Sequence, residues 1–333
     1  MRAQEDTVKN RRAFLGGIAA LCTFAPFAAR AQPAARIYRI GILEAVPASR
    51  NAANLDAFRK GLRDLGYVEG RNLALEYRSS DGQAERFPQL ASELVQANVD
   101  LIVTRGTPAT AAAKAASARI PVVMATMGDP RAIVTSFAHP GGNVTGVTTF
   151  STELTAKRIE LLREIVPTMK RVGLLHNMGN PAVPPEWEET KSAAQALSVG
   201  AELLDVRNES DLHRAFEQAA RNHVDAIVVG LDGLTQANQL AIVELAARNR
   251  LPAAYPSREF VKAGGLIAYA VNYADLYYRF ASFVDKILKG ANPGELPVEQ
   301  PTHFELVINA KTARTLGLSI PQSLLVRATE VIS

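Results

Sequence analysis

Acidic side chains follow three of the short apolar runs in this sequence. Glu44 follows the run IYRIGIL, Asp129 lies three residues beyond the run IPVVMAT, and Asp232 follows DAIVVGL. A carboxylate in such a position can accept hydrogen bonds from a ligand ammonium group. It can equally cap the helix that follows, as an Asp directly before Pro130 often does. Each acid is therefore a candidate for binding a cationic group, with helix capping as the structural alternative.

The turn Arg105-Gly106-Thr107-Pro108 has the pattern of an anion site. It follows the apolar run DLIVT and opens the alanine-rich segment 109–116. This order predicts a helix with Thr107 as its N-cap and Pro108 in its first turn. The free N–H groups and the positive dipole end of such a helix favour a carboxylate. Most strand-to-helix turns share this form, so a purely structural role also fits.

Polar and aromatic residues at the ends of later runs complete the candidate set. Asn177 and Asn180 follow the run RVGLLH, and Tyr255 and Tyr269 lie at strand ends within a tyrosine-rich part of the chain. Tyrosine combines apolar area with a polar tip, which suits a ligand cleft. The predicted ligand-binding residues are Glu44, Gly106, Thr107, Asp129, Asn177, Asn180, Asp232, Tyr255 and Tyr269.

Motifs for catalysis, nucleotide binding and metal binding are missing from the sequence. It contains no GxGxxG, no P-loop and no GxSxG, and its 5 histidines lack metal-ligand spacing. The single cysteine, Cys22, lies in a segment that we expect to be removed. We therefore predict a protein that is not an enzyme and that has no cofactor and no metal site.

The elements that would position the candidate residues alternate between strand and helix. Runs rich in β-branched residues predict strands, and apolar residues at helical spacing predict the helices between them. The strands are expected at 37–43, 72–78, 100–106, 120–126, 144–150, 171–177, 201–207, 225–233, 251–257, 264–271, 303–309 and 323–332. The helices are expected at 51–67, 86–99, 107–119, 155–167, 187–200, 209–224, 234–249, 272–290 (capped by Asn272) and 310–318.

This alternation predicts an α/β fold built from two doubly wound parallel-sheet lobes joined by a multi-strand hinge. A turn-rich break at 138–146 separates the two series of elements. We expect one lobe to contain 37–149 and about 271–292, and the other 150–270 and about 296–333. Since ligands of open parallel sheets bind beyond the carboxyl ends of the strands, the candidate residues would line a cleft between the lobes.

The N-terminal 31 residues have the pattern of a cleaved export signal. The basic stretch 9–12 precedes the apolar run 13–29, and Ala29-Arg30-Ala31 supplies the small residues that a signal peptidase needs. Arg11-Arg12 resembles a twin-arginine signal, so the Tat and Sec routes both stay open. Most of the formal net charge of +4 lies in this segment. The signal predicts a periplasmic protein, and the placement of the charge argues against a nucleic-acid partner. We also expect a monomer.

Longer stretches carry a family resemblance. They are GTPA (106–109), GDP (128–130), PGGNVTG (140–146), KRIELLREIVP (157–167) and the C-terminal segment 284–332. Together they resemble the ABC transporter substrate-binding protein family that includes the tryptophan-binding TrpX type, over essentially the whole chain after the signal.

This resemblance implies a type I periplasmic-binding-protein fold with a ligand held between its lobes. The ligand would be a small molecule, an amino acid or small carboxylate, aromatic ones included. The partner would be an ABC permease with a cytoplasmic ATPase. A periplasmic ligand sensor for a membrane receptor and an enzyme on the same scaffold are the alternatives.

Overall fold

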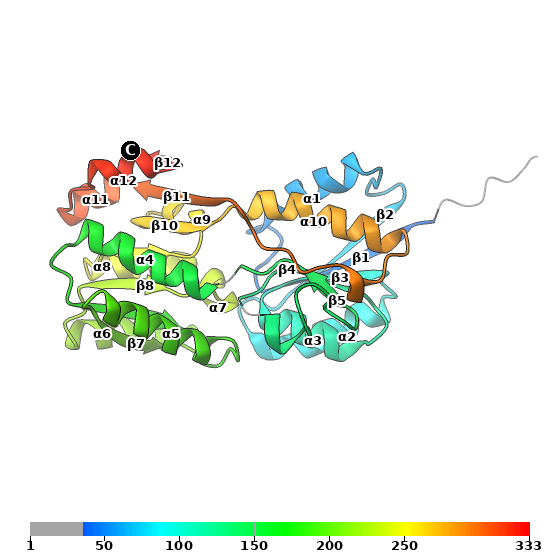
Figure 1. The fold of residues 1–333 in the computed structure, drawn as a ribbon, viewed down its shortest axis with the longest axis horizontal. Coiled ribbons are helices and arrows are strands. Elements are labelled where there is room, and N and C mark those ends of the chain that lie inside the picture. Colours follow the sequence, from blue (N-terminus) through cyan, green and yellow to red (C-terminus); the bar gives the residue numbers. More distant parts are fainter. Residues whose placement is uncertain (1–35, 129, 150) are drawn as a thin grey trace, which may run out of the picture. The chain divides into compact units, whose positions relative to one another are not determined.

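A computed structural model describes residues 36–128, 130–149 and 151–333. These residues form two β-sheets with helices on both faces of each (Figure 1). The predicted export signal and the candidate Asp129 lie outside the described residues. Among the residues described, no helix is both long and apolar enough to cross a membrane.

The first sheet has five parallel strands in the order β2-β1-β3-β4-β5. Its strands are β1 (Tyr38–Glu44), β2 (Leu73–Ser79), β3 (Leu101–Arg105), β4 (Val122–Thr126) and β5 (Val144–Gly146). Its helices are α1 (Ala52–Asp64), α2 (Phe87–Gln96) and α3 (Thr107–Ala116), with short turns η1 (Ala84–Arg86) and η2 (Pro130–Ala132). The strand order reverses beside β1, which is the point where doubly wound sheets bind ligands.

The second sheet has seven strands in the order β12-β11-β10-β9-β8-β6-β7. Its strands are β6 (Arg171–His176), β7 (Gly200–Asp205), β8 (Ala226–Val229), β9 (Ala253–Tyr255), β10 (Ile267–Val271), β11 (Phe304–Asn309) and β12 (Glu330–Ile332). Its helices are α4 (Ser151–Ile165), α5 (Val183–Ala196), α6 (Asp211–Arg221), α7 (Gly233–Ala237), α8 (Gln239–Arg248), α9 (Arg258–Lys262), α11 (Ala310–Leu316) and α12 (Gln322–Arg327). All neighbouring strands are parallel except β10 and β11.

The chain passes between the two sheets three times within the described residues. β5 pairs in the first sheet, whereas α4 packs on β8, β9 and β10 of the second. β10 leads directly into α10 (Tyr273–Leu288), which packs on α1. After the turn η3 (Pro293–Glu295), Glu299 bridges to Val147 before the chain enters β11. Because β11 returns from the first sheet, it runs antiparallel to β10. These crossings confirm the predicted fold class of two doubly wound sheets and a multi-strand hinge.

The apolar residues that recur at helical spacing along α1 face α10. Leu55, Phe58 and Leu62 are buried in one cluster with Tyr277 and other side chains of α10. Leu65, which continues the same spacing, is 41% exposed because α1 ends at Asp64. The helical spacing therefore identifies the buried face of α1. This face ends where the helix ends, at Asp64.

The start of α10 agrees with its predicted cap. The backbone N–H of Asp275 donates to Asn272 Oδ1 at 3.0 Å. Asn272 itself has an extended backbone, as an N-cap residue should. The predicted cap of this helix is confirmed.

Several predicted elements differ from the structure in their bounds; the helix predicted at 187–200, for example, is α5 (Val183–Ala196), and the strand predicted at 144–150 is β5 (Val144–Gly146). Two differ in more than their bounds. The helix predicted at 234–249 is two helices, α7 and α8, which meet at Asn238, whose Nδ2 donates to the Leu234 carbonyl at 3.0 Å. The strand predicted at 323–332 is wrong for its first half, which forms α12. Only Glu330–Ile332 pairs with β11. A short apolar run is compatible with both a strand and a helix, and its pairing with other elements of the fold decides between them.

Candidate functional site

Six of the nine predicted site residues lie at one cavity. Loops from both sheets line it, and the centre of a water-sized sphere can reach about 60 Å³ of it. The polar lining residues are Glu44, Ser80, Arg105, Gly106, Thr107, Thr126, Asn177, Asn180, Glu186, Asp232 and Gln236. The carboxyl ends of β1 and β3 in the first sheet and of β6 and β8 in the second all lie at this cavity. The carboxyl ends of parallel strands are where ligands of such sheets bind.

The first turn of α3 forms one wall. Gly106 is the N-cap, with φ +85° and ψ 159°, a conformation open mainly to glycine. The prediction that Thr107 caps this helix is therefore wrong by one residue. Thr107 is instead the first helical residue, and Pro108 follows it. First-turn N–H groups have no partner within a helix, and this turn lines the cavity. The Gly106 N–H donates to the Thr126 carbonyl at 2.8 Å and Pro108 has no N–H, so Thr107 is the cavity-lining residue of this turn whose N–H is left for a ligand. The wall is suited to a carboxylate.

A hydrogen-bond network around Asp232, which joins Asn177, Asn180 and the start of α7 and is called the Asp232 bracket below, forms the opposite wall. Asp232 Oδ1 accepts from Asn177 Nδ2 at 3.0 Å and from the Leu234 N–H at 2.9 Å. Asp232 Oδ2 accepts from Asn180 Nδ2 at 2.8 Å. Thr235 Oγ1 accepts from the Asp232 N–H, which completes a capping box at the start of α7. Asp232 is therefore a helix cap and a cavity residue at once, and its hydrogen bonds hold the loop 177–180 in place.

Glu44 lies at the carboxyl end of β1 and is buried, with 1% exposure. The Tyr277 hydroxyl and Asn51 Nδ2 both donate to its Oε1, the latter at 3.1 Å. Its Oε2 has no hydrogen-bond partner among the described residues. Burial raises the pKa of Glu44 to about 7, against the opposing effects of Arg105 and the Asn51 hydrogen bond. Glu44 does not cap a helix, so the structural alternative is wrong for this residue.

Arg105 is the last residue of β3, at the carboxyl end of the strand. Its guanidinium lies 4.2 Å from the centre of the Tyr273 ring, which belongs to the first turn of α10. Stacking on an aromatic face stabilises a cation and fixes its plane. Arg105 thus lines the cavity, and its stacking on Tyr273 makes its position depend on α10.

The two tyrosines predicted for the cleft lie elsewhere. Tyr255 is 1% exposed and stacks on Phe260 at 5.0 Å between ring centres. A Cβ at Gly265 would come within 2.5 Å of the Tyr255 ring, so this ring occupies the space over the glycine. Tyr255 therefore belongs to the core of the second sheet, not to the lining of the cavity.

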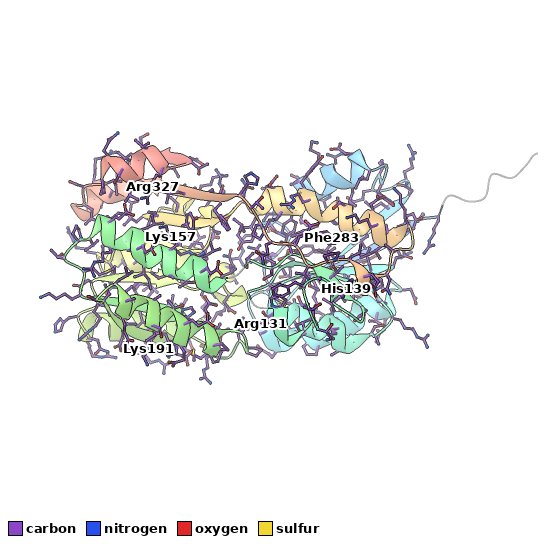
Figure 2. The ribbon with its side chains drawn as sticks, viewed as in Figure 1. Arg131, His139, Lys157, Lys191, Phe283 and Arg327 are labelled. Atoms are coloured by element: carbon purple, nitrogen blue, oxygen red, sulfur yellow. The ribbon has the colours of Figure 1, made fainter. Side chains whose placement is uncertain are left out.

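Tyr269 lines a separate depression. Its ring stacks on Phe304 at 5.8 Å between centres. The same depression is bordered by Lys157 on α4 and Arg327 on α12, which Figure 2 labels. β10 and β11 pair directly at this position, with Tyr269 opposite Leu306. The structure therefore does not bring Tyr269 to the cavity.

Several lining residues were not predicted. Ser80 directly follows β2, so the strand-end rule would have found it had it been applied to that strand. Gln236 lies one turn after Asp232 on α7. Phe87 begins α2, and Glu186 lies within α5. Tertiary packing alone brings these two helices to the cavity. No local sequence signal marks these last two residues.

We expect Glu44→Gln to remove a pH-dependent loss of stability. The pKa of Glu44 rises from 4.5 to about 7 on folding, so the folded protein holds this proton more tightly than the unfolded chain. The free energy of unfolding therefore falls as the pH rises through this window. Relative to the wild type, the variant should gain about 2 kcal/mol between pH 5 and pH 7.5. Urea unfolding at both pH values measures this gain, and an equal difference at the two pH values would contradict it.

The described residues hold no cluster of three or more His, Cys, Asp or Glu side chains that could bind a metal ion. The cavity lining among these residues also has no Cys, His or Lys. The polar groups present are carboxylates, carboxamides, hydroxyls, backbone N–H groups and one guanidinium. Such groups recognise a ligand by hydrogen bonds and charge.

The sequence of this chain is similar to a known family and to a characterised relative. A model of the ABC transporter substrate binding protein family matches residues 39–332. A tyrosine-binding protein of Clostridioides difficile (strain R20291) is 25% identical over 263 residues, which cover 78% of this chain and 75% of the relative.

Two solved structures are also similar. A conserved domain protein from Vibrio cholerae has a TM-score of 0.83 at 27% identity, over 89% of this chain and 100% of that one. An ABC domain in complex with L-Trp from Streptococcus pneumoniae has a TM-score of 0.82 at 27% identity, with 89% and 100% covered. These likenesses agree with the predicted type I periplasmic-binding-protein fold.

Proposed function

The chain belongs to the ABC transporter substrate binding protein family, and on this premise we propose that it is the periplasmic solute-binding component of an ABC importer. One observation carries the proposal: loops of both sheets contribute polar side chains to a single cavity. A ligand that contacts both walls favours the conformation in which they are close. A membrane permease with its own cytoplasmic ATPase would recognise that conformation and receive the ligand.

The proposed ligand is an amino acid or another small carboxylate. The first turn of α3 would hold the carboxylate through the Thr107 N–H, with Gly106 shaping the turn, since the Gly106 N–H already donates to the Thr126 carbonyl. Asn177, Asn180 and Asp232 would form the second wall. The tyrosine and L-Trp named for two relatives support an amino acid. Among the described lining residues only Phe87 is aromatic, so an aromatic side chain would stack on little besides this ring.

The proposed organisation follows the crossings. One lobe would contain 37–149 and about 271–292, and the other 150–270 and about 296–333. An N-terminal signal, 1–31, would direct export by the Tat or Sec route and then be cleaved. The mature protein would act as a monomer, without a nucleic-acid partner. The proposed role includes no chemical conversion of the ligand, since the described lining offers no nucleophile paired with a base.

Ligand screening tests the proposal. The purified protein is first freed of co-purified solutes by unfolding and refolding. It is then heated with amino acids, aromatic acids, small carboxylates, sugars and nucleosides, each in large excess. A solute at 100 times its dissociation constant should add about 2.7 kcal/mol to the free energy of unfolding. A stabilising solute that is recovered unchanged supports a binding protein. Turnover of that solute, or no stabilisation by any solute, would overturn the proposal.

A further inference from the structure

One short helix of the second sheet lies against loops of the first. α7 follows β8, and Figure 1 shows it where the second sheet faces the first. The loops after β1 and β2 contact it through Ala45, Arg50 and Gly82, which we call the α7 notch. The Gly82 N–H donates to the Ala45 carbonyl at 2.8 Å and so joins the two loops. The notch therefore belongs to the first sheet, and the helix in it belongs to the second.

Two glycines allow this close approach. A Cβ at Gly82 would lie 2.8 Å from the Ala237 Cβ, and a Cβ at Gly233 would lie 2.6 Å from the Ala45 Cβ. Both distances are shorter than Cβ atoms adopt, so a side chain at either glycine would push α7 out of the notch. Gly233 lies in the first turn of α7, where the backbone itself accepts alanine. The helix and the notch thus fit each other only without these two side chains.

A hydrogen bond accompanies the steric fit. Arg50 Nη1 donates to the carbonyl of Ala237, the last residue of α7. The last carbonyls of a helix lack a partner within the helix, and basic side chains often bond them. A charged donor makes this bond stronger than one between neutral groups. Arg50 is not among the described residues that line the cavity, so it acts on α7 and not on a solute.

α7 is fixed to the second sheet. The Asp232 bracket caps the helix and ties it to Asn177 and Asn180. Leu234 is 5% exposed and belongs to an apolar cluster of the second sheet. The helix therefore moves with the second sheet. Its contacts with the notch break when the two walls of the cavity separate, and they form again when the walls meet.

The size of the cavity makes such a separation necessary. The centre of a water-sized sphere reaches about 60 Å³ of it, which is room for a few water molecules. A solute larger than water must enter and leave while the walls are further apart. The contacts at α7 are therefore made after a solute has entered, and they must be broken before it leaves.

We propose that α7 and its notch form a latch that slows the release of a bound solute, and that Arg50 is a positioning residue of this latch. The inference rests on the proposed function and names the residues that set how long the solute stays. A latch of this kind acts on the dissociation rate, because it is formed only after the solute has bound. It does not distinguish one solute from another.

Release rates test the role of Arg50. Radiolabelled L-tyrosine, and then L-tryptophan, is bound to the protein and chased with the unlabelled amino acid. Without the bond to the Ala237 carbonyl, Arg50→Ala should release the probe about fivefold faster. Its association rate should stay within about twofold of the wild type. Circular dichroism confirms that the variant is folded.

Two further arginine variants isolate the bond. Arg50→Lys keeps a charged donor, so it should release the probe less than about twofold faster than the wild type. Arg171→Ala is the matched control. Arg171 Nη1 donates to the carbonyl of Asn222, the C-cap of α6, so this variant loses the same kind of bond within the second sheet. It should leave the release rate unchanged.

Spin labels on Gln89→Cys and Glu188→Cys report the distance between the walls. Both residues are exposed, and they lie two residues beyond Phe87 and Glu186 of the lining. Cys22 is the only cysteine in the sequence, so in a Cys22→Ser background the labels attach nowhere else. The distance in the otherwise unchanged protein with saturating probe defines the closed arrangement.

A steric variant uses this distance. Gly233→Ala places a Cβ against Ala45, so with saturating probe the labels should stay further apart and release should be faster. Ala45→Gly in the same chain removes the opposing methyl group. The double variant should recover the wild-type distance, although it still carries the new side chain beside the cavity.

The outcomes separate the latch from the proposed function. Release from Arg50→Ala at the wild-type rate, or equal acceleration in Arg171→Ala, would overturn the latch and leave a solute-binding protein. So would a Gly233→Ala variant that closes to the wild-type distance, or a double variant that stays open. If neither amino acid binds, the solute found by the screen proposed above becomes the probe. If that screen finds no solute, the proposed function fails, and the latch fails with it.

Discussion

Replacing Asp232 with alanine is expected to lower the free energy of unfolding by about 3 to 5 kcal/mol and to weaken ligand binding at least tenfold. The carboxylate accepts hydrogen bonds from Asn177, from Asn180 and from the Leu234 N–H, and it is 7% exposed. Alanine leaves two buried carboxamides without an acceptor and uncaps α7. The loop 177–180 then loses its anchor, and with it one wall of the cavity.

Urea unfolding and calorimetry measure these two effects. Asp232→Asn keeps one acceptor oxygen but presents an NH₂ group toward a donor, so we expect roughly half the loss of stability. Asp56→Ala is the matched control, because the Asp56 side chain is 75% exposed on α1 and should change stability by less than about 0.5 kcal/mol. A variant at Asp232 as stable as this control would show that the bracket carries no stability.

Gly61→Ala is expected to destabilise the protein by about 2 to 3 kcal/mol, although alanine normally favours a helix by about 1 kcal/mol. Gly61 lies inside α1 where α10 crosses it. A Cβ there would lie 2.5 Å from the Tyr278 carbonyl oxygen and 2.8 Å from Ala281 Cβ. Because the first of these atoms is backbone, the two helices would have to separate. Their contact buries much of the apolar cluster on this face of the first sheet.

A second substitution tests the cause. Ala281→Gly in the same chain removes the methyl contact but not the carbonyl contact, so the double variant should recover only part of the loss. Gly200→Ala is the control, since its Cβ would meet only the Lys170 carbonyl oxygen at an ordinary 3.5 Å. Thermal unfolding of the three variants and the wild type decides the matter. A stabilising Gly61→Ala would mean that α1 and α10 can move apart at no cost.

These predictions concern two different kinds of contact. The Asp232 bracket joins segments of one sheet's loops and shapes the cavity directly. The Gly61 contact joins helices from distant parts of the chain and holds α10, which carries Tyr273 and Tyr277, in place. Since Tyr273 stacks on Arg105 and Tyr277 donates to Glu44, the second contact also supports the cavity, although it lies outside it.

The fold class was accessible from the sequence because alternating strands and amphipathic helices are encoded by local periodicity. The order of elements and the positions of most strand ends followed from that pattern. Glu44, Gly106, Asn177 and Asp232 were candidates for the same reason, since a residue after a parallel strand must lie at the ligand-binding edge of its sheet. The family was also recognisable from residues alone.

What only the tertiary structure decided is which side chains reach the cavity. Tyr255 satisfies the strand-end rule but turns into the core against Phe260, because burying an aromatic ring against another is more favourable than leaving it in a wet cleft. Gln236 and Glu186 reach the cavity from helices, at positions where no local pattern distinguishes the cavity from solvent. Periodicity is a property of neighbours in the chain, and it locates the ends of strands. The lining of the cavity depends on contacts between residues far apart in the chain, such as Tyr277 with Glu44, and the packing of the folded protein sets those contacts.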